Sequence, residues 1–271
     1  MVRDITLGQF LPGDSLMHRL DPRAKLGLTL SVIVFIFVAG NFLGLAVMTG
    51  LVFLGMAVSG VSIGRYLKSL KVVLLVVLFT SLLNLFYGGG EVLWEWGFLR
   101  ITWGGVSNSI FVAVRIIVLI FASSVLTFTT SPTQLTDALE RLMKPLSLIR
   151  VPVHEIAMMM TIALRFIPTL LEETDKIMNA QKARGADMES GGILKRVKAL
   201  VPVLVPLFVS SFRRAYELAT AMECRCYRGG KGRTKMKILH MKARDYISCG
   251  VAAAAGAGVI LLRIFITHPY L

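Results

Sequence analysis

The sequence predicts an all-α membrane protein with about five transmembrane helices and a cytoplasmic or interfacial coupling region of crossed amphipathic helices. The 271 residues are 55% hydrophobic and only 17% charged, and their mean hydropathy is +0.70. A soluble domain of this length carries about 25% charged residues, so the missing charge indicates a membrane protein. The net charge of +14 suggests an asymmetric distribution of Lys and Arg around membrane spans rather than a nucleic-acid partner.

The first predicted helix starts at Asp21, which is suited to the N-cap position because Pro22 follows it at the first helical position. The apolar run 26–39 is the first predicted span, and residues 42–59 are the second. Both runs are near the lower limit for crossing a hydrocarbon layer of about 30 Å at about 1.5 Å per residue.

Three further spans follow at residues 72–87, 105–130 and 246–267. Between the third and fourth spans lies a short segment that opens with three glycines and carries all three tryptophans, Trp94, Trp96 and Trp103. Tryptophan prefers the level of the lipid headgroups. This segment is therefore predicted to form a hairpin at the membrane surface.

Positive charge sets the orientation of these spans. Arg65, Lys68 and Lys71 lie between the second and third spans, and residues 131–244 hold 20 Lys or Arg against 10 Asp or Glu. Five spans with a cytoplasmic N-terminus place both regions inside the cell. We therefore expect a four-span region over residues 1–130, a cytoplasmic coupling region over 131–244 and a C-terminal transmembrane helix over 245–271.

The coupling region divides into amphipathic segments at residues 132–147, 152–184 and 193–227. Its longest apolar stretches are interrupted by Arg165 and by Pro168, Pro202 and Pro206. We expect helices at the membrane interface there, with one extra pair of spans as an open alternative. The three prolines are expected to bend or start helices rather than lie within them.

Two of these segments end alike, each with one arginine between small residues. Ala183-Arg184-Gly185 closes the first and Cys224-Arg225-Cys226 the second, at an offset of 41 residues. Each arginine could simply interact with the C-terminal dipole of its own helix. Alternatively, each could pair with a carboxylate of a partner protein, for which a guanidinium in a narrow groove is well suited. Ala215 and Ala219, four residues apart, would let the second helix cross another helix closely.

Other functional sites are poorly supported. The segment Arg228-Gly-Gly-Lys231-Gly-Arg-Thr lacks the spacing of a phosphate-binding loop. Cys224 and Cys226 cannot complete the four ligands of a structural zinc site. We expect no catalytic site, no metal and no cofactor.

Arg115 lies within the fourth predicted span, where a charge is costly and suggests function by default. It could pair with a carboxylate elsewhere in the protein, or lie nearer the membrane interface than the span boundaries imply. It could also line a substrate path, in which case the chain would be a stand-alone membrane carrier or channel.

The sequence resembles the transmembrane T-components of energy-coupling factor (ECF) vitamin transporters over nearly its whole length. The matching blocks are residues 11–23, 129–140, 163–173, 181–185 and 221–230. A pair of Ala-Arg-Gly motifs is typical of that family. The first motif is complete in this chain, as Ala183-Arg184-Gly185. The second keeps Arg225 but has Cys224 and Cys226 in place of Ala and Gly.

The resemblance implies a non-catalytic, multi-pass subunit of an ATP-driven importer in a prokaryotic cell membrane. Two cytosolic ABC-type ATPase subunits would each receive one of the arginine-tipped helices in a groove. A separate membrane protein, the S-component, would bind the vitamin. The T-component would carry the motion of the ATPases to the S-component.

Overall fold

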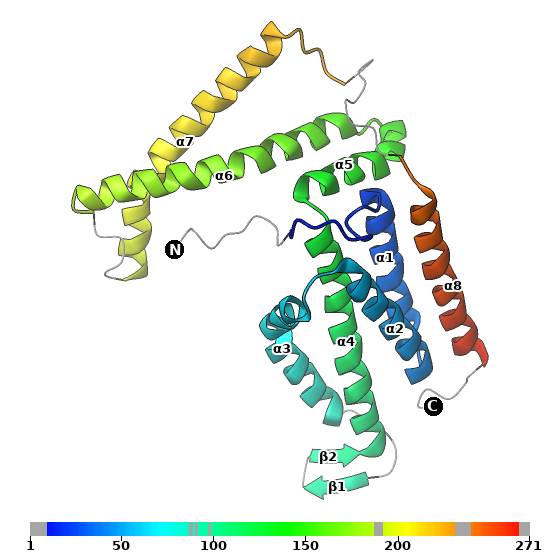
Figure 1. The fold of residues 1–271 in the computed structure, drawn as a ribbon. Coiled ribbons are helices and arrows are strands. Elements are labelled where there is room, and N and C mark those ends of the chain that lie inside the picture. Colours follow the sequence, from blue (N-terminus) through cyan, green and yellow to red (C-terminus); the bar gives the residue numbers. More distant parts are fainter. Residues whose placement is uncertain are drawn as a thin grey trace. The chain divides into compact units, whose positions relative to one another are not determined.

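The computed structural model describes residues 10–86, 89, 92–96, 99–186, 192–230 and 240–265. In these residues the chain is helical apart from one two-stranded hairpin (Figure 1), which confirms the predicted all-α class. The helices are α1 (Pro22–Val38), α2 (Phe42–Ser59), α3 (Ile63–Phe86), α4 (Trp103–Thr129), α5 (Pro132–Leu142), α6 (Val153–Ala183), α7 (Ile193–Cys224) and α8 (Ala243–Phe265).

In the described part of the chain, six helices are long and apolar enough to cross a membrane: α2, α3, α4, α6, α7 and α8. Four of them contain predicted spans. The first predicted span lies in α1, which has 17 residues and is therefore only about 26 Å long. The protein is a multi-pass membrane protein, and α6 and α7 are the least apolar of the six helices.

The three prolines were expected to bend or start helices, and none of them starts one. Pro168 lies inside α6, and Pro202 and Pro206 lie inside α7; a bend at these positions stays a prediction. A proline inside a helix removes one backbone hydrogen bond, and one of the carbonyl groups affected finds another donor, as described below. The single segment expected at 132–147 is instead divided. Here α5 ends at Leu142 and a 3₁₀ helix, η1 (Lys144–Ile149), follows, because Pro145 has no N–H to donate to the Arg141 carbonyl, as a continued α-helix would require.

The predicted hairpin is confirmed. Strands β1 (Val92–Trp96) and β2 (Leu99–Thr102) pair in antiparallel register, with Trp94 opposite Ile101 and Trp96 opposite Leu99. The glycine-containing basic segment from Lys231 and the end of the last predicted span, from residue 266, lie outside the described residues.

The chain divides into two compact units. The first includes residues 139–237 and therefore holds η1, α6 and α7. The second includes residues 8–138 and 238–271, so that it contains α1 to α4 and α8. The segment 139–237 of the first unit is thus inserted in the sequence of the second unit.

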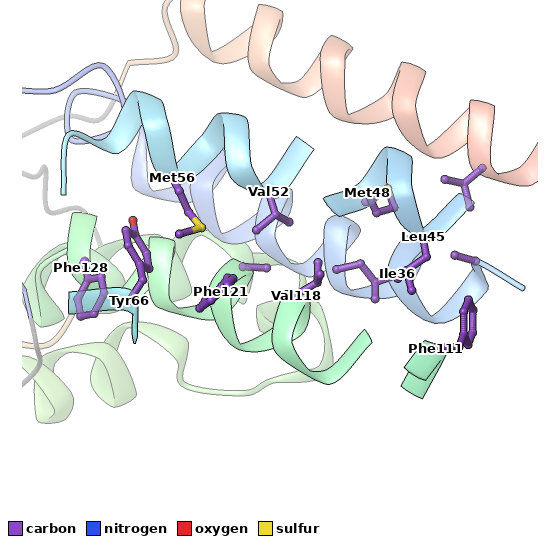
Figure 2. Close-up of a cluster of buried hydrophobic side chains, with 13 residues drawn as sticks. Ile36, Leu45, Met48, Val52, Met56, Tyr66, Phe111, Val118, Phe121 and Phe128 are labelled. Atoms are coloured by element: carbon purple, nitrogen blue, oxygen red, sulfur yellow. The ribbon is translucent and has the colours of Figure 1, made fainter. Parts of the chain in front are cut away.

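The core of the second unit lies between α1, α2 and α4 (Figure 2). Ile36, Met48 and Val118 are almost completely buried in it. Tyr66, at the start of α3, packs edge-on against Phe128, with 5.2 Å between the ring centroids. The hydroxyl oxygen of Tyr66 is 2.9 Å from that of Ser59, so its polar group is satisfied inside the core.

A polar cluster joins one end of α1 to α8. Asp21 is the N-cap of α1, as predicted, and its side chain accepts a hydrogen bond from the Arg23 N–H. The Asp21 N–H donates to the carboxylate of Asp245 at 2.8 Å, and that carboxylate also accepts from the Lys242 N–H at 2.7 Å. Asp245 therefore satisfies backbone donors from both segments.

Lys25 joins the same end of α1 to the end of α4. It is buried, and its Nζ donates to the Thr129 carbonyl at 2.8 Å and to the His18 carbonyl at 3.2 Å. A cation at the last carbonyl groups of a helix is favourable because these groups carry the negative end of the helix dipole.

Candidate functional site: two arginine-capped helix ends

The C-terminus of α6 closes in a Schellman motif. Arg184 is the C-cap residue, and Gly185 follows in the left-handed conformation with φ of 85°. The Gly185 N–H donates to the Lys182 carbonyl at 3.0 Å, and the Ala186 N–H donates to the Gln181 carbonyl at 3.0 Å. These two bonds satisfy carbonyl groups that the helix leaves without partners. Glycine suits the left-handed position because it has no Cβ.

The C-terminus of α7 closes in the same way. Arg225 is the C-cap, and Cys226 takes the left-handed position with φ of 58°. The Cys226 N–H donates to the Glu223 carbonyl at 2.8 Å, and the Tyr227 N–H donates to the Met222 carbonyl at 3.0 Å. The hydrogen-bond pattern therefore matches that of α6 residue for residue, although a cysteine stands where α6 has glycine.

The two arginines consequently occupy equivalent positions on their helices. Their backbone angles are close, with φ of −85° and ψ of 6° at Arg184 and φ of −93° and ψ of 16° at Arg225. Both side chains are exposed, as are the flanking Ala183 and Cys224. Among the described residues, neither guanidinium takes part in an ion pair or a side-chain hydrogen bond. Each helix thus ends in an exposed cation flanked by small side chains.

The helices that carry these ends are joined by a side-chain cluster. Glu173 of α6 accepts a hydrogen bond from Arg214 Nη2 of α7 at 3.0 Å and another from the Ser210 hydroxyl. The two carboxylate oxygens take one bond each. A charge-assisted bond of this kind is stronger than one between neutral groups. The cluster therefore fixes one point of α6 against one point of α7.

A second contact between α6 and α7 explains how α7 continues through a proline. Pro206 has no N–H, so the carbonyl of Pro202, four residues earlier, loses its helical donor. Gln181 Nε2 donates to this carbonyl at 3.3 Å. The donor comes from the last turns of α6, close to Arg184. The proline thus opens a backbone acceptor that binds the other helix.

Ala215 and Ala219 are exposed and do not take part in these contacts. Val203, seven residues before Ser210 and so on the same face of α7, is instead buried. Close packing of another helix on the two alanines remains a prediction. The same stretch of α7 carries large exposed apolar side chains: Phe208, Phe212 and Tyr216 are 66%, 62% and 74% exposed.

Arg115 is bound at the end of α1. Its Nη2 donates to the Ala39 carbonyl at 2.7 Å, and its guanidinium lies 4.5 Å from the centroid of the Phe111 ring. Nearby, Arg263 Nη1 donates to the Val38 carbonyl at 3.1 Å. Two cations thus satisfy the last carbonyl groups of α1. These contacts favour a structural role for Arg115 and give no support to a substrate path.

Sequence reasoning missed the cluster of Glu173, Ser210 and Arg214. The signal was present, because Glu173 and Arg214 are separated by the same 41 residues as Arg184 and Arg225. A charged face on each helix was expected, but periodicity alone does not indicate which charges meet.

Comparison with known proteins agrees with this architecture. Residues 13–236 match the family model CbiQ, described as cobalt transport protein. The chain is 51% identical over 263 residues to the energy-coupling factor transporter transmembrane protein EcfT of Ruminiclostridium cellulolyticum, which covers 97% of this chain and 98% of the relative. EcfT of Clostridium kluyveri is 51% identical over 98% of this chain and 99% of its own length. EcfT of Acidaminococcus fermentans is 47% identical over 100% of this chain and 98% of its own length.

Proposed function

Because the chain belongs to the CbiQ family, as a membrane T-component of energy-coupling factor transporters, we propose that it couples two cytosolic ABC-type ATPase subunits to a membrane S-component. The S-component binds a vitamin or another micronutrient, and the ATPases supply the energy for its uptake. The chain itself hydrolyses no ATP. In this arrangement the N-terminus and the first unit of the chain face the cytoplasm.

The observation that carries this proposal is the equivalence of the two helix ends. Two subunits of an ATPase dimer present two similar grooves, and two similar grooves require two similar ligands. Arg184 and Arg225 have the same backbone motif, the same place relative to the helix end and the same exposure. If each arginine only interacted with the C-terminal dipole of its own helix, the two helices would not need the same cap.

An acidic groove is the partner that these ends fit best. Each guanidinium offers several N–H donors in a plane and has no acceptor among the described residues. Inside a groove it would pair with a carboxylate in bidentate geometry. The flanking residues Ala183, Gly185, Cys224 and Cys226 are small enough to let the arginine enter.

Coupling also requires that the two helices move as one unit. The contacts of Glu173 with Arg214 and of Gln181 with the Pro202 carbonyl hold α6 and α7 together. A displacement of both ends is therefore carried along helices of about 47 Å each. The exposed apolar side chains of α7, with Ala215 and Ala219 among them, offer a packing surface for the S-component.

The proposal predicts that reversing the charge at either helix end weakens assembly. In Arg184→Glu or Arg225→Glu, a carboxylate would face the acidic groove, and we expect a loss of about 2–4 kcal/mol in ATPase binding. Co-purification of the ATPases with the tagged chain measures assembly, and ATP-driven uptake in vesicles measures coupling. Arg184→Lys, which keeps the charge but not the bidentate geometry, should lie between wild type and Arg184→Glu.

Arg213→Glu is the matched control, because Arg213 is an exposed cation on α7 away from its end. It should leave co-purification of the ATPases unchanged. Normal uptake by the double variant Arg184→Glu/Arg225→Glu would disprove the proposal. So would robust ATP hydrolysis by the purified chain alone.

A further inference from the structure

A half-open apolar cavity of about 290 Å³ lies at the surface of the second unit of the chain, and its lining residues Leu16, Ile247 and Val251 are 53%, 66% and 47% exposed. Residues of α1, α2, α4 and α8 line it, together with the segment that precedes α1; they include Leu20, Val32, Val58, Ala122 and Val251. All of these elements belong to one compact unit. The cavity therefore belongs to the membrane bundle itself and involves neither of the two arginine-capped ends.

The walls of this cavity offer no free side-chain polar group. Thr29 and Ser248 are its only lining residues with a side-chain hydroxyl. The Thr29 hydroxyl donates to the Lys25 carbonyl at 2.9 Å, and the Ser248 hydroxyl donates to the Arg244 carbonyl at 2.8 Å. A half-open apolar cavity on a membrane bundle offers water no polar partners and is open to surrounding hydrocarbon. In a bilayer, the hydrocarbon at hand is the acyl chain of a lipid.

Cations lie at one end of the cavity. Arg19 directly precedes the lining residue Leu20, and its side chain is 60% exposed. Arg244 lies four residues before the lining residue Ser248, and so on the same face of α8. Lys242, just before α8, is exposed.

The basic residues of this region outnumber the acidic ones. Against Arg19, Arg23, Lys25, Lys242 and Arg244 stand Asp14, Asp21 and Asp245, and Asp21 lies 3.9 Å from Arg23. Asp14 is 4.0 Å from Arg19, but its side chain is 96% exposed, and an ion pair so open to solvent contributes little. The end of the cavity thus carries positive charge that a phosphate would complement.

We propose that this cavity binds one phospholipid with an anionic headgroup. An acyl chain fills the space between α1, α2, α4 and α8, and the headgroup phosphate contacts Arg19 and Arg244. The site depends on the membrane location of the bundle and is independent of how the chain contacts an ATPase.

The test uses the full-length chain in bilayers of phosphatidylcholine with one tenth phosphatidylglycerol. The protein is released into mild detergent, and native mass spectrometry counts the lipids that stay bound. We expect one retained phosphatidylglycerol, enriched over its share in the bilayer. Arg19→Gln and Arg244→Gln should each lower this enrichment about fivefold, since one cation near a membrane surface contributes about that factor.

Two cavity-filling variants test the acyl-chain half of the site. Val251→Phe and Val58→Phe should each reduce retention of both lipids, because the larger ring occupies the space of the chain. Ile260→Phe, on a residue of α8 that does not line the cavity, and Lys68→Gln, an exposed cation outside it, are the matched controls. Helicity and elution volume confirm that each variant is folded.

Two results would overturn the proposal. One is retention of the two lipids in the ratio that they have in the bilayer, which would show that the site does not select an anionic headgroup. The other is unchanged retention in both filling variants, which places the bound lipid elsewhere.

Discussion

At the scale of single residues, Cys226 shows how a helix end can keep its geometry without its preferred amino acid. The left-handed position after a C-cap favours glycine, and a residue with a Cβ is strained there. Gly185 meets this preference at the end of α6, whereas Cys226 does not at the end of α7. The two hydrogen bonds that close the Schellman motif nevertheless form. The cap is therefore retained at an energetic cost.

Cys226→Gly should consequently stabilise the end of α7 by about 1 kcal/mol. The expected result is slower hydrogen exchange, by about fivefold, at the backbone N–H groups of residues 226 and 227 that close the motif. Cys224→Ala, at an ordinary helical position, is the control and should leave these rates unchanged. Exchange that is as fast as in the wild type would show that Cys226 is not strained.

Arg115 illustrates the opposite case, in which a conspicuous residue has an ordinary role. A charge inside an apolar segment suggests a functional path, but here the guanidinium binds the Ala39 carbonyl and the Phe111 ring. The end of α1 has carbonyl groups that lipid cannot satisfy. Arg115 and Arg263 satisfy two of them.

At the scale of elements, α6 and α7 are held together by polar groups. Between two apolar helices in or near a membrane, the hydrophobic effect gives little preference for one crossing point. The carboxylate of Glu173, which binds Ser210 and Arg214, and the Pro202 carbonyl, which binds Gln181, specify that point. The proline contributes by freeing an acceptor in the middle of α7.

A double-mutant cycle should detect this contact. Glu173→Gln, Arg214→Gln and the double variant should give a coupling free energy of about 1 kcal/mol, a value limited by the partial exposure of the pair. The measurement is the free energy of unfolding in mixed micelles. The same cycle on the exposed neighbours Glu172 and Arg213 is the control, with no coupling expected. Equal coupling in the two cycles would argue against a specific crossing point.

At the scale of the whole molecule, the last helix returns to the start of the chain. Asp21 and Asp245 are 224 positions apart and are joined by a buried hydrogen bond. The bundle is therefore closed by groups from opposite ends of the chain, with residues 139–237 between them in the sequence.

Asp245→Asn tests this closure. An amide has a single acceptor oxygen, so either the Asp21 N–H or the Lys242 N–H would be left without a partner in a site where Asp245 is only 2% exposed. We expect a loss of about 2 kcal/mol in the free energy of unfolding. Asp14→Asn, at an exposed carboxylate, should be neutral. Equal effects of the two substitutions would show that the buried cluster does not stabilise the bundle.

The sequence by itself determined the local features of this protein. Apolar runs and their breaks predicted the helices, Asp21 and Pro22 predicted the start of α1, and the repeated arginine predicted two similar helix ends. These features depend on residues within a few positions of one another, which is why a sequence pattern reveals them. The family resemblance supplied the role of those ends, and that role remains a proposal.

Only the tertiary structure decided which distant groups meet. Nothing local joins Glu173 to Arg214, Asp21 to Asp245 or Arg115 to the end of α1, because each of these polar groups had several possible partners along the chain. The choice follows from packing, since a buried polar group must find a partner that the fold brings within reach. The same packing leaves the cavity between α1, α2, α4 and α8, whose lining residues are scattered from Leu16 to Ala252.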